Sequence, residues 1–429
     1  EGGRPQQITR GKTQGASRGI ADFIAQEEMR RPSGFWWSRE GDYIAFTEVE
    51  EDHIPQFNIL HSGDADPGPA SVETHRYPFS GSENPRVKLG VTDLQGHINW
   101  LNTSEYEYIA RVNWGRSHVL YVQCQNREQT RLDLLSFDIP SGARKTILNE
   151  ESDVWVNLHD MIYPLEDGKL IWASERTGYQ HLYLYDLDLQ TNTYITRGDW
   201  RVDAISSVDE LNQLIYFNAT IATHKESRTY RVSFQGGEPE LTTSESGMHS
   251  TKFSMRSDWM VDVYHSLTQP PTVRLSKFER DYEAIQVHQI SDSGIELMDL
   301  KAPEFFDVEA ESGELLSGAI YKPDLEKFGD GPHPTIIYVY GGPHGQLVTN
   351  GWNMTVSMRA QYLCQKGFLV SVLDNRGSAR RGLTFESYIK NNMGMVEVRD
   401  QVDGVRYLID KKLADPGRVG IYGWSYGGY

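Results

Sequence analysis

The sequence predicts two fold classes in one chain: an all-β propeller, present in part, followed by an α/β sheet. From about residue 20 to 295, short strands alternate apolar and aromatic residues with polar ones, and the turns are rich in Gly, Asp, Asn and Ser. A strand pattern recurs there at intervals of roughly 40 to 50 residues, as blades of a propeller do. After about residue 300, near-continuous apolar strands alternate with helical patterns, which predicts a sheet buried on both faces.

The blade repeat is carried by an aliphatic-aromatic step within a strand, at Leu120-Tyr121, Ile171-Trp172 and Ile215-Tyr216. Each step is followed by a second strand, a turn and a Thr-containing third strand. Residues 43–46 and 259–263 resemble further copies, and we expect an insertion after the first of them, through about residue 97. This count predicts four to five blades, and an open array of β-sandwiches is the alternative.

The α/β part begins with two apolar strands, at residues 334–340 and 367–373. A helix is predicted over 357–366, and an amphipathic helix over 396–411. That second helix carries its apolar side chains on one side. These side chains are Val398, Val402, Val405, Leu408 and Ile409. A further strand over 418–422 completes the strand and helix order of an α/β-hydrolase sheet, so we place the domains at 1–298 and 299–429.

Composition excludes several function classes. The 429 residues are 38% hydrophobic and 11% aromatic, enough for two or more folded units. A net charge of -18 disfavours nucleic acid and anionic lipid as partners. No apolar run approaches the length of a membrane span, but the first residue is Glu1 rather than Met, so a targeting segment or anchor would lie outside this sequence.

The two cysteines, Cys124 and Cys364, form neither a disulfide framework nor a metal-ligand spacing. We therefore expect a reducing compartment, the cytoplasm, with the periplasm or the cell exterior as alternatives. No metal and no cofactor are expected.

The most informative residues are the last eleven, where Ser425 stands between Gly423 and Gly427 directly after an apolar strand. A nucleophile elbow needs this arrangement, because the strained turn from strand to helix has no room for a β-carbon at the flanking positions. The alternative is a glycine-rich turn with an incidental serine, since the bare pattern arises by chance in long chains.

A serine nucleophile needs a base and an acid, which follow it in chain order in α/β-hydrolases. All 13 histidines precede Ser425, so we expect the acid and the base beyond Tyr429 and expect the chain alone to be inactive. For the oxyanion hole, the sequence suggests the backbone N–H of Tyr426 and the hydroxyl of Tyr340. Tyr340 could equally be a strand-end aromatic in the core, and His344 is read as a loop residue.

Several short motifs, in order along nearly the whole chain, resemble those of the dipeptidyl peptidase IV family of prolyl oligopeptidase-type serine peptidases. They are Gln26-Glu-Glu-Met29, Gly34-Phe-Trp-Trp-Ser38, His75-Arg-Tyr-Pro78, Gly81-Ser-Glu-Asn-Pro85, Tyr340-Gly-Gly-Pro343, Asp374-Asn-Arg-Gly-Ser378, Asn392-Met-Gly394 and Gly423-Trp-Ser-Tyr-Gly-Gly428. Their details look nearer to cytosolic dipeptidyl peptidases eight and nine, or to bacterial relatives, than to the membrane-bound animal enzyme. The resemblance implies a β-propeller capping an α/β-hydrolase domain, and it implies that this chain is a fragment truncated at both ends.

The resemblance also implies roles for individual residues. Glu27 and Glu28 would capture the free amino group of a peptide, although adjacent acids in so acidic a chain would otherwise be read as solvated surface charge. Ser425 would be the nucleophile and Tyr340 the oxyanion tyrosine. Trp424 and Tyr426 would line the substrate pocket, favouring Pro or Ala before the cleaved bond. The cations of Arg30-Arg31 depart from the family pattern and are expected beside the glutamates.

The resemblance implies a serine exopeptidase that releases X-Pro or X-Ala dipeptides from peptides with a free N-terminus, and it implies a homodimer for the full-length protein. One alternative is another prolyl oligopeptidase-type activity, an endopeptidase or an acyl-peptide hydrolase. Another is a non-catalytic relative that acts as an interaction protein.

Overall fold

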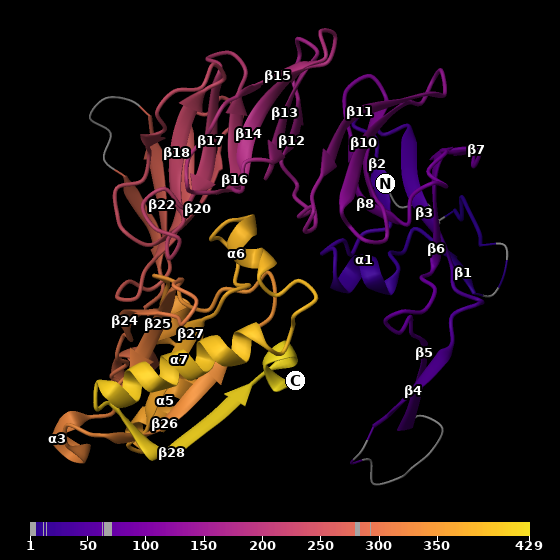
Figure 1. Ribbon diagram of the computed structural model, residues 1–429. Helices are drawn as coiled ribbons and strands as arrows, with labels where there is room; N and C mark the ends of the chain where they lie inside the picture. Colours follow the sequence, from indigo (N-terminus) through magenta and orange to yellow (C-terminus); the bar gives the residue numbers. More distant parts are fainter. Residues whose placement is uncertain are drawn as a thin grey trace. The chain divides into compact units, whose positions relative to one another are not determined.

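The structure is a computed structural model that describes residues 6–11, 13, 15–61, 63, 71–278, 284–291 and 293–429. Its contacts group the chain into two compact units, Glu1–Asp160 and Met161–Tyr429. Figure 1 draws both, coloured along the sequence. Within the described residues, no helix combines the length and the hydropathy needed to cross a membrane.

The described part of the first unit contains two large antiparallel sheets and one two-stranded sheet. One has the order β1-β3-β6-β7, with β2 also paired to β3. Its strands are β1 (Ala16–Arg18), β2 (Phe35–Trp37), β3 (Tyr43–Glu50), β6 (Arg86–Asp93) and β7 (Ile98–Trp100). The other has the order β11-β10-β9-β8. Its strands are β8 (Tyr108–Trp114), β9 (Val119–Gln125), β10 (Arg131–Asp138) and β11 (Ala143–Glu151). Buried aliphatic side chains of both sheets form one core.

The insertion predicted through about residue 97 is shorter than expected. A hairpin of β4 (Gln56–Leu60) and β5 (Val72–Arg76) does follow β3, but β6 already pairs with β3 along its whole length. The apolar alternation in β6 was missed because Gly90 interrupts it. A β-carbon at Gly90 would lie 3.0 Å from the Trp100 ring and 3.2 Å from Phe46, so glycine lets these aromatic rings cover the strand.

The second unit begins with three four-stranded antiparallel sheets, each with its strands in sequence order. The first holds β12 (Ile162–Pro164), β13 (Lys169–Ser174), β14 (His181–Asp186) and β15 (Thr191–Tyr194). The second holds β16 (Val202–Asp209), β17 (Leu214–Ala219), β18 (Arg228–Ser233) and β19 (Glu240–Leu241). The third holds β20 (Met248–Phe253), β21 (Trp259–His265), β22 (Thr272–Lys277) and β23 (Ile285–Gln289).

These sheets confirm the predicted repeat and the propeller-like fold class. The aliphatic-aromatic steps lie in the same strand of successive sheets, in β9, β13 and β17, and Leu120, Ile171 and Ile215 are all fully buried. In the described part of the chain the two units contain four four-stranded sheets and one five-stranded sheet of this propeller-like kind, and these five reach the upper end of the predicted count.

The α/β part is a five-stranded sheet in the order β24-β25-β27-β26-β28. Its strands are β24 (Glu304–Glu309), β25 (Leu315–Tyr321), β26 (His333–Val339), β27 (Leu369–Asp374) and β28 (Ala414–Gly423). The helices of the second unit are α2 (Ser293–Leu297), α3 (Leu325–Phe328), α4 (Trp352–Thr355), α5 (Met358–Gln365), α6 (Leu383–Ser387) and α7 (Val396–Asp410). The three predicted strands β26, β27 and β28 are parallel, and both predicted helices are present. The β24–β25 hairpin was not predicted.

The buried face of α7 differs from the predicted one. Val398 and Val402 are 58% and 41% exposed, whereas the helix buries Glu397, Asp400 and Gln401 in its first turns. The prediction followed the apolar residues alone. The polar side chains are buried instead because they hold backbone and side-chain groups of neighbouring loops, as described below. Leu408, farther along the same helix, packs on the sheet as expected.

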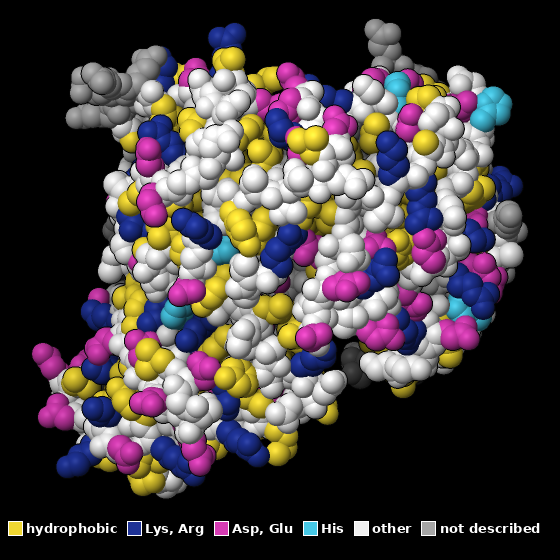
Figure 2. Space-filling model, turned by 45° about the horizontal axis from the view of Figure 1, so that its top comes forward, with side chains coloured by type: hydrophobic (Ala, Val, Ile, Leu, Met, Phe, Trp, Pro, Cys, Tyr) yellow, Lys and Arg dark blue, Asp and Glu magenta, His cyan; other side chains and the backbone are white. Residues whose placement is uncertain are grey.

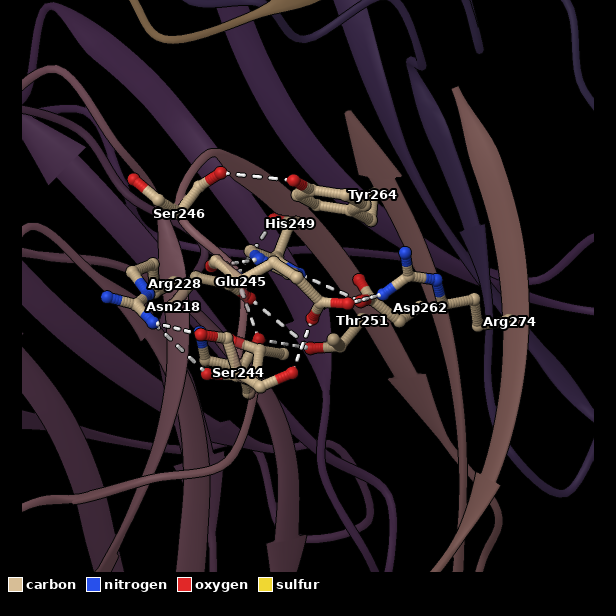
Figure 3. Close-up of polar contacts among 12 residues, drawn as sticks. Asn218, Arg228, Ser244, Glu245, Ser246, His249, Thr251, Asp262, Tyr264 and Arg274 are labelled. Atoms are coloured by element: carbon tan, nitrogen blue, oxygen red, sulfur yellow. Dashed lines mark hydrogen bonds and ion pairs between the residues drawn. The ribbon is translucent and has the colours of Figure 1, made fainter. Parts of the chain in front are cut away.

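Polar contacts join the last propeller-like sheets to each other and to the α/β part. Figure 3 shows the buried cluster between the sheets, where His249 Nδ1 lies 2.8 Å from Asp262 Oδ2 and Asn218 Nδ2 donates to the His249 carbonyl at 2.9 Å. Toward the α/β part, Arg380 Nη2 pairs with Asp203 Oδ2 at 2.8 Å, and Asn350 Nδ2 donates to Glu226 Oε1 at 2.9 Å. The predicted domain boundary between residues 298 and 299 lies between β23 and β24 and stays a prediction.

Candidate functional site

The chain after β28 turns sharply into a 3₁₀ helix, Ser425–Gly428, and Ser425 has a positive φ of 55°. Such a conformation is strained for a residue with a side chain and persists mainly where the surrounding structure enforces it, often at active sites. A β-carbon on Gly423 would lie 2.0 Å from the carbonyl oxygen of Gly427, and one on Gly427 would lie 2.1 Å from that of Val339. The predicted need for both glycines is confirmed.

Tyr340 and Ser425 come together because their strands are parallel neighbours. Val339, the last residue of β26, is in register with Gly423, the last residue of β28. The residues that follow both strands therefore meet at one edge of the sheet, where open α/β sheets place their ligands. The Tyr340 ring lies 6.3 Å from the Tyr426 ring, centroid to centroid.

The two tyrosines differ in their contacts. Tyr426 Oη donates to Glu397 Oε1 at 2.5 Å, and burial together with this carboxylate raises the pKa of the phenol, so the hydroxyl stays a neutral donor. The half-buried Tyr340 has no hydrogen bond from its hydroxyl to another residue in the described part of the chain. Its ring packs beside Gly345, where a β-carbon would lie 2.5 Å away.

Ser425 itself is exposed, and Trp424 is 77% exposed, so its predicted part in a substrate pocket stays a prediction. His344 is exposed in the loop after β26 with a φ of 56°, in keeping with the loop residue we expected.

The motif Asp374–Ser378 holds the loop after β26 in place. The buried Asp374 accepts hydrogen bonds from the backbone N–H groups of Leu347 at 2.8 Å and Val348 at 3.0 Å. Burial raises the pKa of Asp374 to about 6, and the two N–H donors oppose that shift. Asn375 Nδ2 donates to the Gly341 carbonyl at 3.1 Å, next to Tyr340.

Helix α7 anchors the same motif. Asp400 is fully buried, and it accepts from Arg376 Nη2 at 2.7 Å and from the Arg376 backbone N–H at 2.8 Å. Gln401 Nε2 donates to the Leu373 carbonyl at 3.0 Å and to Asn375 Oδ1 at 3.2 Å. Asp400 and Gln401 were not predicted as residues that support the site. The sequence signal that could have identified them is a set of three polar residues, Glu397, Asp400 and Gln401, on one face at the start of an otherwise amphipathic helix.

Glu27 and Glu28 lie in the first unit, at the end of helix α1 (Phe23–Glu27), which Asp22 caps by accepting from the Ala25 N–H at 3.0 Å. Both glutamates are exposed, and neither forms an ion pair with another described residue. Ala25 in the helix and Met29 just after it are buried and anchor this segment in the first unit. The two carboxylates are thus presented to solvent without a cationic partner in the described chain.

The expectation that two cations flank the glutamates is wrong for Arg31. This residue is 5% exposed, and its guanidinium pairs with Asp22 at 3.5 Å, donates to the Ser33 carbonyl at 2.8 Å and lies over the Trp36 ring. The Arg31 charge is balanced within the first unit, because a buried guanidinium needs a carboxylate partner and hydrogen-bond acceptors. Arg30 is exposed, as expected.

Among the described residues, one group of His, Asp and Glu side chains has ligand-like spacing. Glu40, Asp42 and His118 offer atoms within 4.8 Å of one another on exposed turns of the first unit. His118 Nε2 already pairs with Asp42 Oδ2 at 3.1 Å and Glu40 Oε2 at 3.7 Å, so the group is adequately explained as a surface ion pair.

Comparison with known families decides the relationship. Residues 1–271 match the family described as the dipeptidyl peptidase IV (DPP IV) N-terminal region. The chain belongs to the dipeptidyl peptidase IV family. Residues 354–429 match the prolyl oligopeptidase family, so both parts of the resemblance seen in the sequence are confirmed.

Curated relatives and solved structures agree with this family. Human dipeptidyl peptidase 8 is 31% identical, and the match covers 96% of this chain and 55% of that protein. Dipeptidyl peptidase 4 of Trichophyton equinum is 28% identical, and the match covers 96% of this chain and 56% of that protein. The crystal structure of Porphyromonas gingivalis dipeptidyl peptidase 4 has a TM-score of 0.87 at 23% identity, over 99% of this chain and 60% of that one. The structure of a putative dipeptidyl aminopeptidase IV from Bacteroides ovatus has a TM-score of 0.86 at 25% identity, and the match covers 98% of this chain and 62% of that one. The chain thus spans little more than half the length of these curated relatives.

Proposed function

We propose that the full-length protein containing this chain is a serine exopeptidase that releases X-Pro or X-Ala dipeptides from peptide N-termini. The observation that carries the proposal is Ser425 at a φ of 55°, held between two sterically required glycines at the end of a parallel strand, in a member of the dipeptidyl peptidase IV family.

In the proposed reaction, Ser425 Oγ attacks the carbonyl carbon of the second residue and gives its proton to a general base. The C–N bond then breaks, the amine leaves with a proton, and water hydrolyses the acyl-enzyme. The backbone N–H of Tyr426 and the hydroxyl of Tyr340 donate to the oxyanion. The side-by-side position of the two tyrosines supports this assignment, as does a Tyr340 hydroxyl without a hydrogen-bond partner among the described residues.

Glu27 and Glu28 are proposed to bind the α-amino group. An α-amine has a pKa of about 7.7 to 8.0, so it is mostly cationic at neutral pH. Hydrogen bonds between such a cation and carboxylates are each worth roughly 1.5 to 3 kcal/mol. The exposure of both carboxylates and their lack of a cationic partner among the described residues support this role. Trp424 and the Tyr426 ring are proposed to line the pocket for Pro or Ala.

The test uses Gly-Pro-amide substrates with a free or an acetylated amine. We expect cleavage of the free amine only, and complete loss of activity in Ser425→Ala. Preference for the acetylated substrate would instead favour the acyl-peptide hydrolase or endopeptidase alternative. A wild-type protein that cleaves neither substrate would favour the non-catalytic interaction protein.

The glutamate pair has a separate test. We expect Glu27→Gln and Glu28→Gln each to raise KM for the free-amine substrate by about 10-fold or more, because each removes a charge-assisted contact. Glu40→Gln, an exposed acid of the same unit, is the matched control and should leave KM unchanged. An unchanged KM in both variants would mean that Glu27 and Glu28 are ordinary surface charges and do not bind the α-amino group.

We propose further that the protein is a cytoplasmic homodimer. Both cysteines are unpaired and buried, which suits a reducing compartment. On the face drawn in Figure 2, acidic and basic side chains are interspersed. Sedimentation of the full-length protein tests the dimer.

A further inference from the structure

Glu397 is a buried carboxylate that has no role in the reaction proposed above. The residue is 4% exposed and forms no ion pair within the described residues. Its two oxygens each accept one hydrogen bond, Oε1 from Tyr426 Oη at 2.5 Å and Oε2 from the Gly394 N–H at 2.9 Å. It also lies in the first turn of α7, where the helix dipole favours a negative charge. A carboxylate placed this way is a fixed acceptor.

The side chain that Glu397 holds belongs to the residue after the nucleophile. Tyr426 lies in the first turn of the 3₁₀ helix, where backbone N–H groups lack partners within the helix. Its ring is fixed at both ends: the hydroxyl is bound to Glu397, and the Cβ–Cγ end packs on the backbone of Gly342. A β-carbon on Gly342 would lie 2.8 Å from Tyr426 Cγ. With the ring held at two points, the direction of the Tyr426 N–H is held as well.

The same helix face also holds the second loop of the site. Gln401, one turn farther along α7, donates to Asn375 Oδ1 at 3.2 Å, and Asn375 Nδ2 donates to the Gly341 carbonyl at 3.1 Å. Gly341 directly follows Tyr340. The start of α7 therefore contacts the elbow directly and the Tyr340 loop through one intermediate residue.

We propose that Glu397 is a positioning residue for peptide cleavage: it holds Tyr426 so that its backbone N–H faces the oxyanion and its ring lines the pocket for Pro or Ala. This inference rests on the proposed function. It assigns Glu397 an indirect role, because the carboxylate acts through Tyr426.

The test compares Glu397→Met, Glu397→Gln, Tyr426→Phe and the double variant Glu397→Met/Tyr426→Phe in the full-length protein. Glu397→Met removes both acceptors at similar volume, whereas Glu397→Gln keeps one. We expect Glu397→Met and Tyr426→Phe each to lower kcat on Gly-Pro-amide by roughly 10- to 100-fold, as expected for a weakened oxyanion donor. The double variant should lose no more than either single variant, and Glu397→Gln should retain more activity than Glu397→Met.

The matched control is Glu386→Gln on α6, another buried glutamate, 1% exposed and 3.8 Å from Arg201. We expect it to lower the melting temperature while leaving kcat within about two-fold of the wild type. Losses that are fully additive in the double variant, or an equal kcat loss in Glu386→Gln, would overturn the positioning role.

Labelling of Ser425 by a fluorophosphonate separates this proposal from the function on which it rests, because the reagent needs the oxyanion hole but no dipeptide. A wild type that is labelled but releases no dipeptide contradicts only the exopeptidase proposal. Equal labelling rates in wild type and Glu397→Met contradict only the positioning role. A wild type that neither reacts nor cleaves overturns both.

Discussion

At the scale of single residues, Gly427 is the position where the elbow packs directly against the backbone of the neighbouring strand β26. A β-carbon there would lie 2.1 Å from the Val339 carbonyl oxygen, a backbone atom of the neighbouring strand that cannot rotate away. We expect Gly427→Ala to displace Ser425 and to slow fluorophosphonate labelling by about 100-fold, since a shift near 1 Å can have that effect. The free energy of unfolding should fall by about 1–3 kcal/mol, as measured by denaturant titration.

Gly428→Ala is the control at the adjacent position. The nearest heavy atom to its added β-carbon would be the Gly423 carbonyl oxygen at 3.8 Å, an ordinary contact, so labelling should stay close to that of the wild type. If both alanine variants lost reactivity equally, close packing against Val339 would not be the reason that the elbow needs glycine.

At the scale of elements, α7 is held to the sheet edge by the buried Arg376–Asp400 pair. The side chains are 11% and 0% exposed. Removing one partner leaves an uncompensated charge in the interior, which typically costs about 3–5 kcal/mol. We expect Asp400→Ala to destabilise the protein by that order in chemical denaturation and to loosen the Asp374–Ser378 motif.

Arg406→Ala on the same helix is the comparison, because Arg406 is 67% exposed and pairs with Asp403 at the surface. Its removal should change the free energy of unfolding by less than about 1 kcal/mol. Similar losses in both variants would mean that helix propensity, rather than the buried pair, determines the stability of this region.

At the scale of the whole molecule, the contact between the last propeller-like sheets and the α/β part contains a half-buried histidine, His224. His224 Nε2 lies 3.1 Å from Ser317 Oγ of β25. Burial, with a smaller effect from Arg381 and Lys225, lowers the pKa of His224 from 6.5 to about 4. The unfolded chain therefore binds a proton more readily than the folded one between these values. We expect the free energy of unfolding to be highest above pH 6.5 and to fall as the pH drops toward 4.

His224→Gln isolates this effect, because glutamine retains hydrogen-bonding groups but does not titrate in this range. Asp374 acts in the opposite sense, since its raised pKa of about 6 stabilises the folded state as the pH falls toward 3.8. The Asp374 contribution is common to the wild type and His224→Gln, so it cancels in the difference between their free energies of unfolding. Denaturation midpoints at neutral and mildly acidic pH should show a larger loss in the wild type than in His224→Gln, and parallel losses would contradict the assignment to His224.

Much of the fold followed from local pattern. The strands β26, β27 and β28 and the helices α5 and α7 were predicted, as was the blade repeat through β9, β13 and β17. The steric role of Gly423 and Gly427 was also predicted, because the spacing of the two glycines around Ser425 is visible in the sequence, although the atom that Gly427 meets belongs to the distant residue Val339. The β24–β25 hairpin, the early end of the insertion at β6 and the buried face of α7 were not. For the buried face of α7 the deciding partners, Arg376 and Tyr426, are distant in the sequence.

The sequence by itself determined which segments become strands and helices, the order of the two fold classes, the family and the strained turn at Ser425, because each depends on side-chain periodicity or on neighbours along the chain. Only the tertiary structure decided which polar groups are buried. Glu397 is inside because Tyr426 and Gly394 satisfy its oxygens, Asp400 because Arg376 pairs with it, and Arg31 because Asp22 neutralises it. A polar side chain is buried only where the fold supplies its partner, and no local pattern records that partner.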